Sequence, residues 1–463
     1  MALTISVEDI ISTTNNPLLQ AKSHWTRVRL GDVATVLNGY AFKAELFNRN
    51  EGTPLIRIRD VGSKDSQTLY SGEFESKYLV QPGELLIGMD GDFNCARWRG
   101  KPSLLNQRVC KVSISAAAYE DRFLDFVLPG YLKAINDATS SITVKHLSSR
   151  TIQDLPLPCP PIDEQREIVA ELEKQFSRLD EAVANLQRVK ANLKRYKASV
   201  LKDAVEGRLV PTEAELARRE GRSFETGEQL LQRILVDRRK HWVGRGKYKD
   251  PDVVMDQNLQ ALPDGWTWMS VDALAFVTKL AGFEYTKFVK YDHSGDLAVI
   301  KAENAGSEGF RRTAFSKVKS ESVSLLTRSK LTAGDLLMVF VGAGTGKVAC
   351  VPDDRPYFLG PNISMIRVDK NHAVPQYIEH YLRSPQGHSL ALGFTKAVAQ
   401  PSLSMGTIRC IPVALPPRAE QVRIAAEVDR RMSLVRSVEA GVDANLKRAQ
   451  ALRQSVLSKS FSR

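Results

Sequence analysis

One glycine-rich run has residue types that could bind a phosphate or a nucleotide cofactor. Val341 to Lys347 reads VGAGTGK and follows an apolar stretch. A phosphate-binding P-loop needs glycine at position 341 and serine or threonine at 348, and the chain has valine at both. A dinucleotide loop should open a helix, whereas the following VACVPDDRPYFLGP contains three prolines and predicts strand and turn. We therefore expect no cofactor site here.

Other residues that could do chemistry do not form a catalytic set. Asp60 with Glu75 and Lys77 resembles the acids and lysine of a nuclease, but the second half of the chain has no equivalent. The sequence lacks the Asn-Pro-Pro-aromatic tetrad that amino-methyltransferases use on a flipped base, and its seven histidines form no HExxH pattern. The five cysteines are odd in number and form no CxxC pair, which indicates free thiols. We expect neither catalysis nor a metal site.

Basic side chains are the strongest chemical signal. The chain carries a net charge of +12 and has a pI of about 9.4, which favours a polyanionic partner such as nucleic acid. Arginine and lysine bind phosphates and can read guanine. Two groups of them lie near predicted loops, and we take these as candidate DNA contacts: Arg57, Arg59, Lys64, Arg97, Arg99, Lys101 and Arg108 in the first group, and Lys301, Arg311, Arg312, Lys347 and Lys396 in the second.

The elements that must position these residues occur twice. LPLPCPPIDEQREIVAEL, from residue 155, recurs as IPVALPPRAEQVRIAAEV, from residue 411. Pro160, Pro161, Glu164 and Gln165 each recur 256 residues later, without a gap. A duplication of this kind predicts a pseudo-symmetric architecture with two equivalent parts.

Each copy of this motif opens a long proline-free stretch that predicts a helix of about 44 residues, or about 65 Å. Apolar residues repeat every seven positions in both stretches, which is typical of a coiled-coil seam. The seam residues are Leu172, Leu179, Leu186, Leu193 and Val200 in the first stretch, and Val428, Val435, Val442, Ala449 and Val456 in the second. We place the other core position three residues further on, at Ala182, Val189, Tyr196, Val438 and Leu452. Packing of the two helices on each other as an antiparallel pair is favoured over separate packing on their own domains.

A segment of 130 to 150 residues precedes each helix, and the two segments share a framework. PLIRIRDVG (54–62) matches LAVIKAENAG (297–306), VQPGELLIGMDG (80–91) matches LTAGDLLMVFVG (331–342), and LSSRTI (147–152) matches LSMGTI (403–408). These are short strands with turn residues, and helices are expected near 123–135 and 375–392. The loops between them differ, so we expect one fold with two different ligands.

A connector joins the first helix to the second segment. Thr226 to Gln229 forms a capping box before a short amphipathic helix, which runs into the basic stretch RRKHWVGRGKYKDP (238–251). A contact with phosphates and a solvated connector are equally compatible with that stretch. The residues before Asn16 include no basic side chain and form no signal peptide, and the apolar runs are too short to span a membrane. We expect a cytoplasmic protein.

The order of variable segment, long helix, variable segment and long helix, with PPxxEQ at the start of each helix, resembles the specificity subunit of type I restriction-modification enzymes. The resemblance covers nearly the whole chain apart from a tail before Trp25, to which we assign no role. It implies two target-recognition domains of α/β (α+β) fold, joined by an antiparallel coiled coil of two long helices. The expected parts are an N-terminal extension (1–24), target-recognition domain 1 (25–155), a central spacer helix (156–207), a linker (208–262), target-recognition domain 2 (263–411) and a C-terminal spacer helix (412–463).

The resemblance also implies how the protein works. Each domain would read one half of a split, non-palindromic DNA site, and half-sites on one face of the DNA lie ~34–36 Å or a multiple apart. Two modification subunits would dock on the helices and methylate adenine with S-adenosylmethionine, and restriction subunits that use ATP and Mg²⁺ would join them. This chain would bind no cofactor or metal itself. Two alternatives remain open at this stage: a self-contained methyltransferase or nuclease with built-in specificity domains, and a coiled-coil adaptor without DNA contact.

Overall fold

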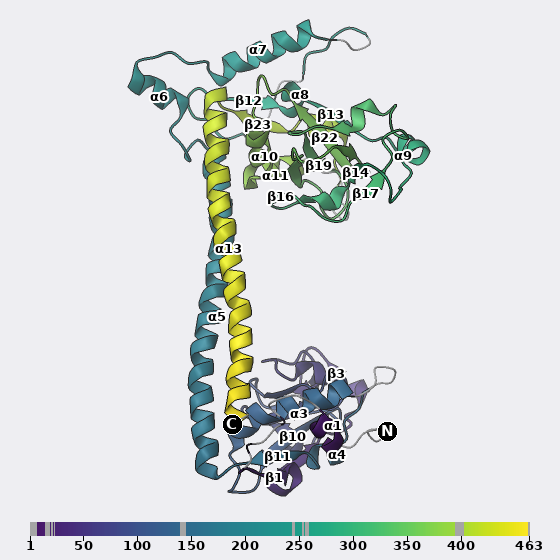
Figure 1. The fold of residues 1–463 in the computed structure, drawn as a ribbon, viewed down its shortest axis with the longest axis vertical. Coiled ribbons are helices and arrows are strands. Elements are labelled where there is room, and N and C mark those ends of the chain that lie inside the picture. Colours follow the sequence, from purple (N-terminus) through teal and green to yellow (C-terminus); the bar gives the residue numbers. More distant parts are fainter. Residues whose placement is uncertain are drawn as a thin grey trace. The chain divides into compact units, whose positions relative to one another are not determined.

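The computed structural model describes residues 7–13, 19, 22, 24–138, 145–242, 246–251, 254, 259–393 and 402–461. The chain divides into two compact units. The first unit comprises residues 1–187 and 443–463, and the second comprises residues 188–442. Each unit is described by itself below, and the elements carry the labels of Figure 1.

The first unit contains two main sheets and a two-stranded ribbon. One sheet has the order β2-β10-β7-β8 and the other the order β3-β5-β4-β9-β6, in which β4 and β9 run parallel. The ribbon pairs β1 (Thr26–Arg29) with β11 (Pro156–Cys159). The strands of the sheets are β2 (Ala34–Asn38), β3 (Phe47–Asn48), β4 (Thr53–Ile56), β5 (Leu69–Tyr70), β6 (Leu79–Val80), β7 (Leu85–Gly88), β8 (Cys95–Arg97), β9 (Ser103–Leu105) and β10 (Val109–Ile114).

Helices cover the first of these sheets and complete the main core of the unit. The helices are α1 (Val7–Thr13), α2 (Leu30–Val33), α3 (Leu124–Ala138) and α4 (Ser149–Gln153). Leu128, Tyr131 and Ile135 of α3 are buried with Leu85 and Ile87 of β7 in one cluster. Ile10 and Leu19, from the segment before Trp25, are buried in the same cluster. This N-terminal segment is therefore part of the core of the first unit.

The second unit repeats this architecture. One sheet has the order β13-β22-β19-β20, the other the order β17-β14-β21-β18 with β14 and β21 parallel, and β12 pairs with β23. The strands are β12 (Thr267–Ser270), β13 (Ala275–Lys279), β14 (Leu297–Ile300), β15 (Ala305–Gly306), β16 (Gly309–Phe310), β17 (Ser316–Val318), β18 (Lys330–Leu331), β19 (Leu336–Val339), β20 (Val348–Cys350), β21 (Tyr357–Leu359), β22 (Ile363–Val368) and β23 (Pro412–Leu415). The helices are α6 (Glu213–Glu220), α7 (Gly227–Lys240), α8 (Val271–Leu274), α9 (Gly282–Phe288), α10 (Pro375–Arg383), α11 (Pro385–Gly393) and α12 (Met405–Arg409).

The matched sequence motifs form matched structures. In the first motif, the amide of Arg57 donates to Asp60 over 2.9 Å and the amide of Lys301 donates to Asn304 over 2.8 Å, directly after β4 and β14. In LSSRTI and LSMGTI, the hydroxyls of Ser148 and Ser404 cap α4 and α12. Helices α3, α10 and α11 lie where helices were expected. The prediction of one fold in two copies is confirmed.

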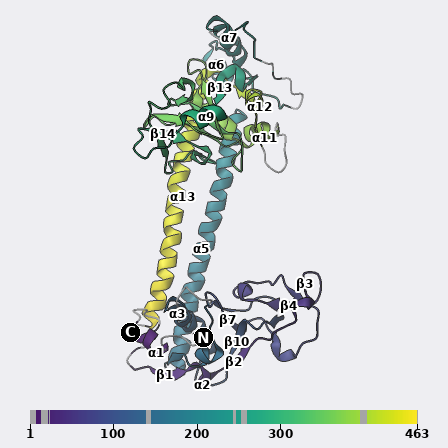
Figure 2. The same ribbon diagram turned by 90° about the vertical axis from the view of Figure 1, so that its right-hand side faces the viewer.

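Two helices of 44 residues each, α5 (Ile162–Val205) and α13 (Arg418–Phe461), contribute to both units. In the first unit, Asp180 of α5 pairs with Arg453, near the end of α13, over 2.6 Å. In the second unit, Lys197, near the end of α5, pairs with Glu439 of α13 over 2.8 Å. The helices therefore pair in antiparallel fashion, as Figures 1 and 2 show for the ribbons.

The burial of side chains along these helices differs in one respect from the predicted pattern. All ten predicted seam side chains are buried or half-buried. The side chains three residues further on, at Ala182, Val189, Tyr196, Val438 and Leu452, are exposed. For five of the ten seam residues, the side chain four positions further on is apolar and buried or half-buried instead: Phe176, Val183, Ala204, Met432 and Leu446. A heptad alternates steps of three and four residues, and the leucine repeat alone does not show which step comes first.

The connector forms the predicted capping box and helix. The hydroxyl of Thr226 accepts from the amide of Gln229 over 3.2 Å, and α7 buries Leu230 and Ile234 against the second unit. Among the described residues, no helix is long and apolar enough to cross a membrane.

Candidate nucleic-acid interface

Most candidate cations of the first unit are exposed near the ends of strands. Arg57 and Arg59 lie beside the turn that follows β4, and Lys64 lies in the loop after it. Arg99 and Lys101 belong to the loop between β8 and β9, and Arg108 belongs to the turn between β9 and β10. All six side chains are exposed, so their positive charge is available to an anionic partner.

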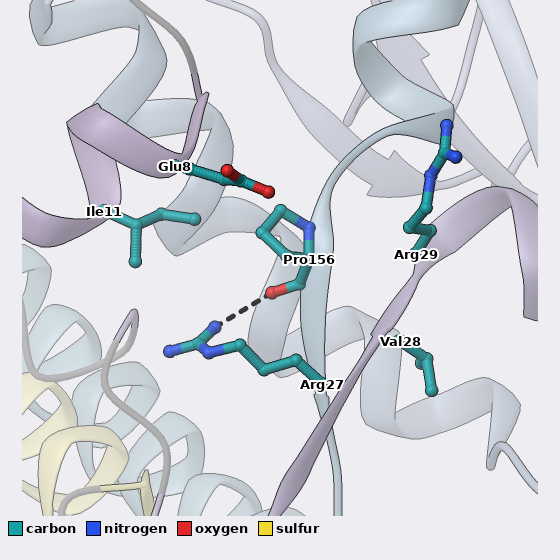
Figure 3. Close-up of a pocket in the computed structure, with 6 residues that line it drawn as sticks. All are labelled: Glu8, Ile11, Arg27, Val28, Arg29 and Pro156. Carbon is teal, nitrogen blue, oxygen red and sulfur yellow. Dashed lines mark hydrogen bonds between the residues drawn. The ribbon is translucent and has the colours of Figure 1, made fainter.

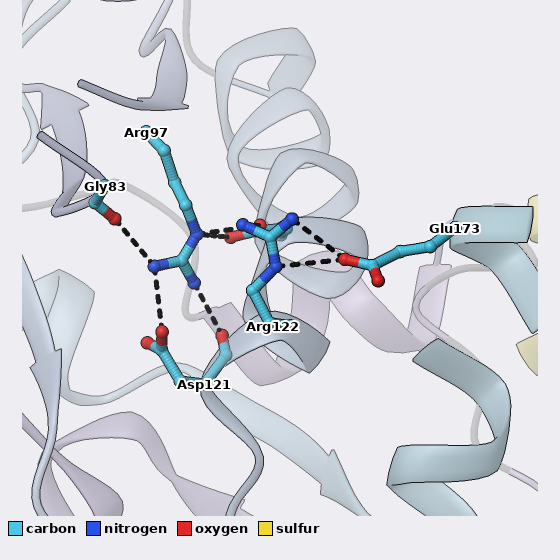
Figure 4. A network of polar contacts seen from close by, with 6 residues as sticks. Gly83, Arg97, Asp121, Arg122 and Glu173 are labelled. Atoms are coloured by element: carbon cyan, nitrogen blue, oxygen red, sulfur yellow. Dashed lines mark hydrogen bonds and ion pairs between the residues drawn. The ribbon is translucent and has the colours of Figure 1, made fainter. Parts of the chain in front are cut away.

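Arg97 is the exception, because its own side chain is largely covered within a network of polar contacts (Figure 4). Its side chain is only 14% exposed, and its Nε lies 2.8 Å from both oxygens of Asp125. Its other nitrogens donate to the carbonyls of Gly83 and Asp121. Burial raises the pKa of the Asp125 carboxyl although Arg97 opposes this shift. Arg97 thus joins β8 to the start of α3, and its geometry does not support the prediction of a DNA contact.

Arg122, the other arginine in Figure 4, connects the segment before α3 to the long helix α5. Arg122, just before α3, donates from Nη2 and Nε to Glu173 of α5 over 2.8 and 3.0 Å. Both residues belong to the first unit, so this contact adds to the packing of the first turns of α5 on that unit.

The candidate cations of the second unit differ in exposure: two are exposed and two are half-buried. Arg311 and Arg312 are exposed after β16, and Arg312 donates to Asp354 over 2.9 Å. Lys301 is half-buried, donates to the hydroxyl of Ser316 over 2.7 Å and lies 4.7 Å from the ring centroid of Tyr291. Lys347 is half-buried. Lys396 lies outside the described residues.

The glycine-rich run forms a tight turn between two strands. The amides of Thr345, Gly346 and Lys347 donate to the carbonyls of Gly342, Val339 and Gly344, and β20 follows directly. A phosphate cradle requires amides that point outward at the start of a helix. These three amides are used inside the turn, so its geometry does not resemble a phosphate-binding loop.

The PPxxEQ motif holds each unit on the start of its helix. The indole nitrogens of Trp25 and Trp266 donate to Glu164 and Glu420 over 3.1 and 3.0 Å. Gln165 donates to the carbonyl of Pro160 over 2.8 Å, and Gln421 repeats this bond to Pro416 over 2.9 Å. We call each tryptophan–glutamate pair with its glutamine a clasp. The clasps were not predicted, because Trp25-Thr26 and Trp266-Thr267 open the segments that precede the motif and lie far from it in sequence.

The two clasp glutamates have different surroundings. The side chain of Glu164 is 26% exposed; burial raises its pKa, but hydrogen bonds from Lys22 and Trp25 outweigh this and lower it. Glu420 is fully buried and also accepts the amide of Glu213 at the start of α6, over 2.8 Å. Burial raises the pKa of Glu420 to about 7, although its hydrogen bonds oppose this shift. The same motif therefore carries an ionised acid in one unit and an acid that titrates near neutral pH in the other.

A cavity of 470 Å³ opens between α1 and the β1–β11 ribbon of the first unit (Figure 3). Glu8, Ile11 and Pro156 line it together with Arg27. The Arg27 guanidinium donates to the carbonyls of Pro156 and Leu19 over 2.9 and 2.5 Å. Arg27 is thus used to hold the N-terminal segment on the ribbon.

Comparisons with known proteins agree with this architecture. The family model for the type I restriction modification DNA specificity domain matches residues 22–194 and 263–439. The chain is 32% identical over 462 residues to the type I restriction enzyme EcoBI specificity subunit of Escherichia coli, which covers 100% of this chain and 90% of that protein. The EcoKI specificity subunit of Escherichia coli strain K12 is 32% identical over 149 residues, or 30% of this chain and 31% of that protein.

A solved structure shows the same fold. One chain from a study of complex assembly and conformational transition of the type I R-M system superimposes with a TM-score of 0.59 and 16% identity, over 96% of this chain and 98% of that chain. The family match at both copies and the similarity over the whole chain agree with the duplicated fold described above. The chain therefore belongs to the type I restriction-modification specificity subunits, which are non-catalytic DNA specificity components of these enzymes.

Proposed function

We propose that the two units read the two halves of one split, asymmetric DNA site. The observation that carries this proposal is the repetition of one framework with different exposed loops. The strands, caps and clasps recur, whereas the exposed cations at the strand ends differ in number and position between the units. Two readers of one fold with different surfaces should recognise two different short sequences.

Exposed cations provide the sequence-independent part of this binding. Arg57, Arg59, Lys64, Arg99 and Lys101 of the first unit and Arg311 of the second can neutralise phosphates. A protein that neutralises phosphates releases counterions, so its DNA affinity falls steeply as salt rises. Replacing one phosphate-binding side chain should reduce the slope of that salt dependence by about 1.

The paired helices are the proposed docking surface for two modification subunits, which restriction subunits then join. Within the second unit, Val189 and Tyr196 of α5 and Leu434 and Val438 of α13 expose apolar surface. Exposed apolar side chains on a helix pair favour contact with a protein partner. We propose that S-adenosylmethionine, ATP and Mg²⁺ act on those partner subunits, that this chain binds none of them, and that the complex works in the cytoplasm.

A domain exchange tests the two-reader proposal. Residues 25–154 are replaced by the corresponding segment of another specificity subunit, and the full chain is expressed with its modification partner. Sequencing of methylated DNA should then show a change in one half of the recognised sequence only. A change in both halves, or in neither, would refute the assignment of one half-site to each unit.

A binding assay separates this function from a self-contained enzyme. The purified full chain without partners should bind no S-adenosylmethionine in calorimetry, and the assembled complex should bind it. Tight binding by the chain alone would favour the built-in methyltransferase.

A further inference from the structure

Three chain segments meet at one corner of the first unit. The amide of Met89 donates to the carbonyl of Arg108 over 2.9 Å, and the amide of Leu147 donates to the carbonyl of Met89 over 2.7 Å. Asp90 and His146 form an isolated antiparallel bridge beside these bonds. We call residues 89–91, 108 and 145–147 corner 1.

The second unit builds the same corner from equivalent segments. The amide of Phe340 donates to the carbonyl of Asn362 over 3.2 Å, and the amide of Leu403 donates to the carbonyl of Phe340 over 2.8 Å. Val341 and Ser402 form the corresponding bridge. We call residues 340–342, 362 and 402–403 corner 2. In each corner, the residue that follows the bridge residue Asp90 or Val341 is a glycine with positive φ: Gly91 at 73° and Gly342 at 98°.

The side chains on these two equal frames are different. In corner 1, Arg108 is 54% exposed, and its guanidinium lies 3.1 Å from Oδ2 of Asp90, which is only 16% exposed. The other oxygen of Asp90 lies 2.6 Å from Nδ1 of His146. In corner 2 the equivalent positions hold Val341, Asn362 and Ser402, and the last two are exposed. The backbone is constant and the exposed chemistry varies, as two readers of different half-sites require.

Each corner offers a group that suits base recognition. A guanidinium has five donors, and Asp90 holds one part of it while half of the side chain stays open to solvent. Such pre-organisation lowers the entropy that binding costs. Asn362 has a φ of 65°, a conformation that asparagine tolerates better than most residues, and its amide is exposed at the turn. Arginine bonds guanine through two hydrogen bonds, and asparagine bonds adenine in the same way.

We propose that the corners are the base-reading elements of the two units: Arg108 contacts a guanine in one half-site, and Asn362 contacts an adenine in the other. Asp90 is then a positioning residue for Arg108. This inference rests on the proposed function, because it assigns the residues that distinguish the two half-sites. It also gives the glycine-rich run of corner 2 a role, since Gly342 to Gly346 lack bulky side chains that would keep DNA from Asn362.

The test uses the full chain with its modification partner and sequencing of methylated DNA as the readout. Arg108→Gln should lower the preference for one guanine in one half-site by about 5- to 150-fold, with the other half unchanged. Arg108→Lys keeps the charge but lacks the planar fork, so it should also lose guanine preference. Asn362→Gly keeps the backbone conformation and should relax one adenine position in the opposite half.

Arg29→Gln is the matched control. Arg29 is also an exposed arginine paired with an aspartate, Asp154, but it lies on β1 outside the corners and the candidate contacts. This variant should keep both half-sites. Asp90→Asn should weaken the same guanine preference as Arg108→Gln. In the double variant, Asp90→Asn should cause no further loss of that preference beyond the loss from Arg108→Gln. A purely structural role of Asp90 would not produce this result.

The outcomes separate this inference from the proposed function. If the wild-type complex methylates a bipartite sequence and the corner variants methylate it with unchanged preference, the corners are not the readers, although the two-reader function stands. A wild-type sequence without guanine in the half read by the first unit would also overturn the inference. If the wild-type complex shows no bipartite sequence, the proposed function itself fails.

Discussion

The stability of the second unit should depend on pH through Glu420. This carboxyl is fully buried, accepts the indole of Trp266 and the amide of Glu213, and has its pKa raised by burial from 4.5 to about 7. A raised pKa means that the folded state keeps a proton that the unfolded state releases. The contribution of Glu420 to stability is therefore fully present below pH 4.5 and is lost as pH rises through 7. The difference between 4.5 and about 7 corresponds to about 3 kcal/mol.

Hydrogen exchange measures this effect in each unit separately. In the full chain, protection of the segment 418–425 should fall about 20-fold between pH 5.5 and 7.5, after correction for the intrinsic exchange rate, which equals about 2 kcal/mol. Glu420→Gln is neutral at every pH, so it should abolish this change. Glu420→Gln should also lower protection at low pH. The glutamine side chain has only one oxygen, so either the indole of Trp266 or the amide of Glu213 would face its NH2 group and lose its acceptor.

Glu164 provides the internal control. Hydrogen bonds from Lys22 and Trp25 outweigh burial and lower its pKa, so its contribution is present above 4.5 and is lost only as pH falls further. Glu164→Gln should leave the pH dependence between 5.5 and 7.5 unchanged at both clasps. An unchanged pH dependence of the segment 418–425 in Glu420→Gln would refute the reasoning, because Glu420 would then not titrate in this range.

Three further predictions concern the helices and the Arg97 network. Val428→Ala removes a fully buried seam side chain and should lower the free energy of unfolding by about 2 kcal/mol in urea titrations, whereas Val189→Ala, on the exposed face, should change it by less than about 0.5 kcal/mol. Arg97→Gln should cost about 2 kcal/mol, because Asp125 keeps only its longer ion pair with Arg122, and it should leave the recognised sequence unchanged; altered methylation sites would instead make Arg97 a DNA contact. Tyr196→Glu should reduce co-purification of the modification subunit without lowering the melting temperature of the chain, and full recovery of the partner would exclude this docking surface.

Much of the fold follows from local patterns that occur twice. The PPxxEQ motif, the leucine repeat and the strand-turn motifs each predict an element from residues close in sequence, and their repetition at one fixed offset predicts two equivalent units. The phase of the second core position was not predictable in this way. Whether Val183 or Ala182 faces the seam depends on the rotation of one helix against its partner, and both residues are apolar.

The candidate DNA contacts were also predictable only in part. The sequence picks out arginines and lysines near loops, but it does not distinguish Arg97 from Arg108, which are both basic residues next to apolar strands. Arg97 pairs with Asp121, just before α3, and with Asp125 in its first turn, and only 14% of its side chain is exposed. Arg108 pairs with one aspartate at an open corner and is 54% exposed. The pairing of β7 with β8 and β10 places these residues, and a single sequence does not record that pairing.

The duplicated architecture, the long paired helices and the family could be predicted without a structure, because periodicity, prolines and a repeated motif act over short stretches of chain. Three properties depend on the three-dimensional fold: which cations are exposed, which glutamate of the repeated motif has a raised pKa, and which segments form equivalent corners. These properties depend on burial and on contacts between residues far apart in sequence. The electrostatic environment of a side chain exists only once those residues are brought together.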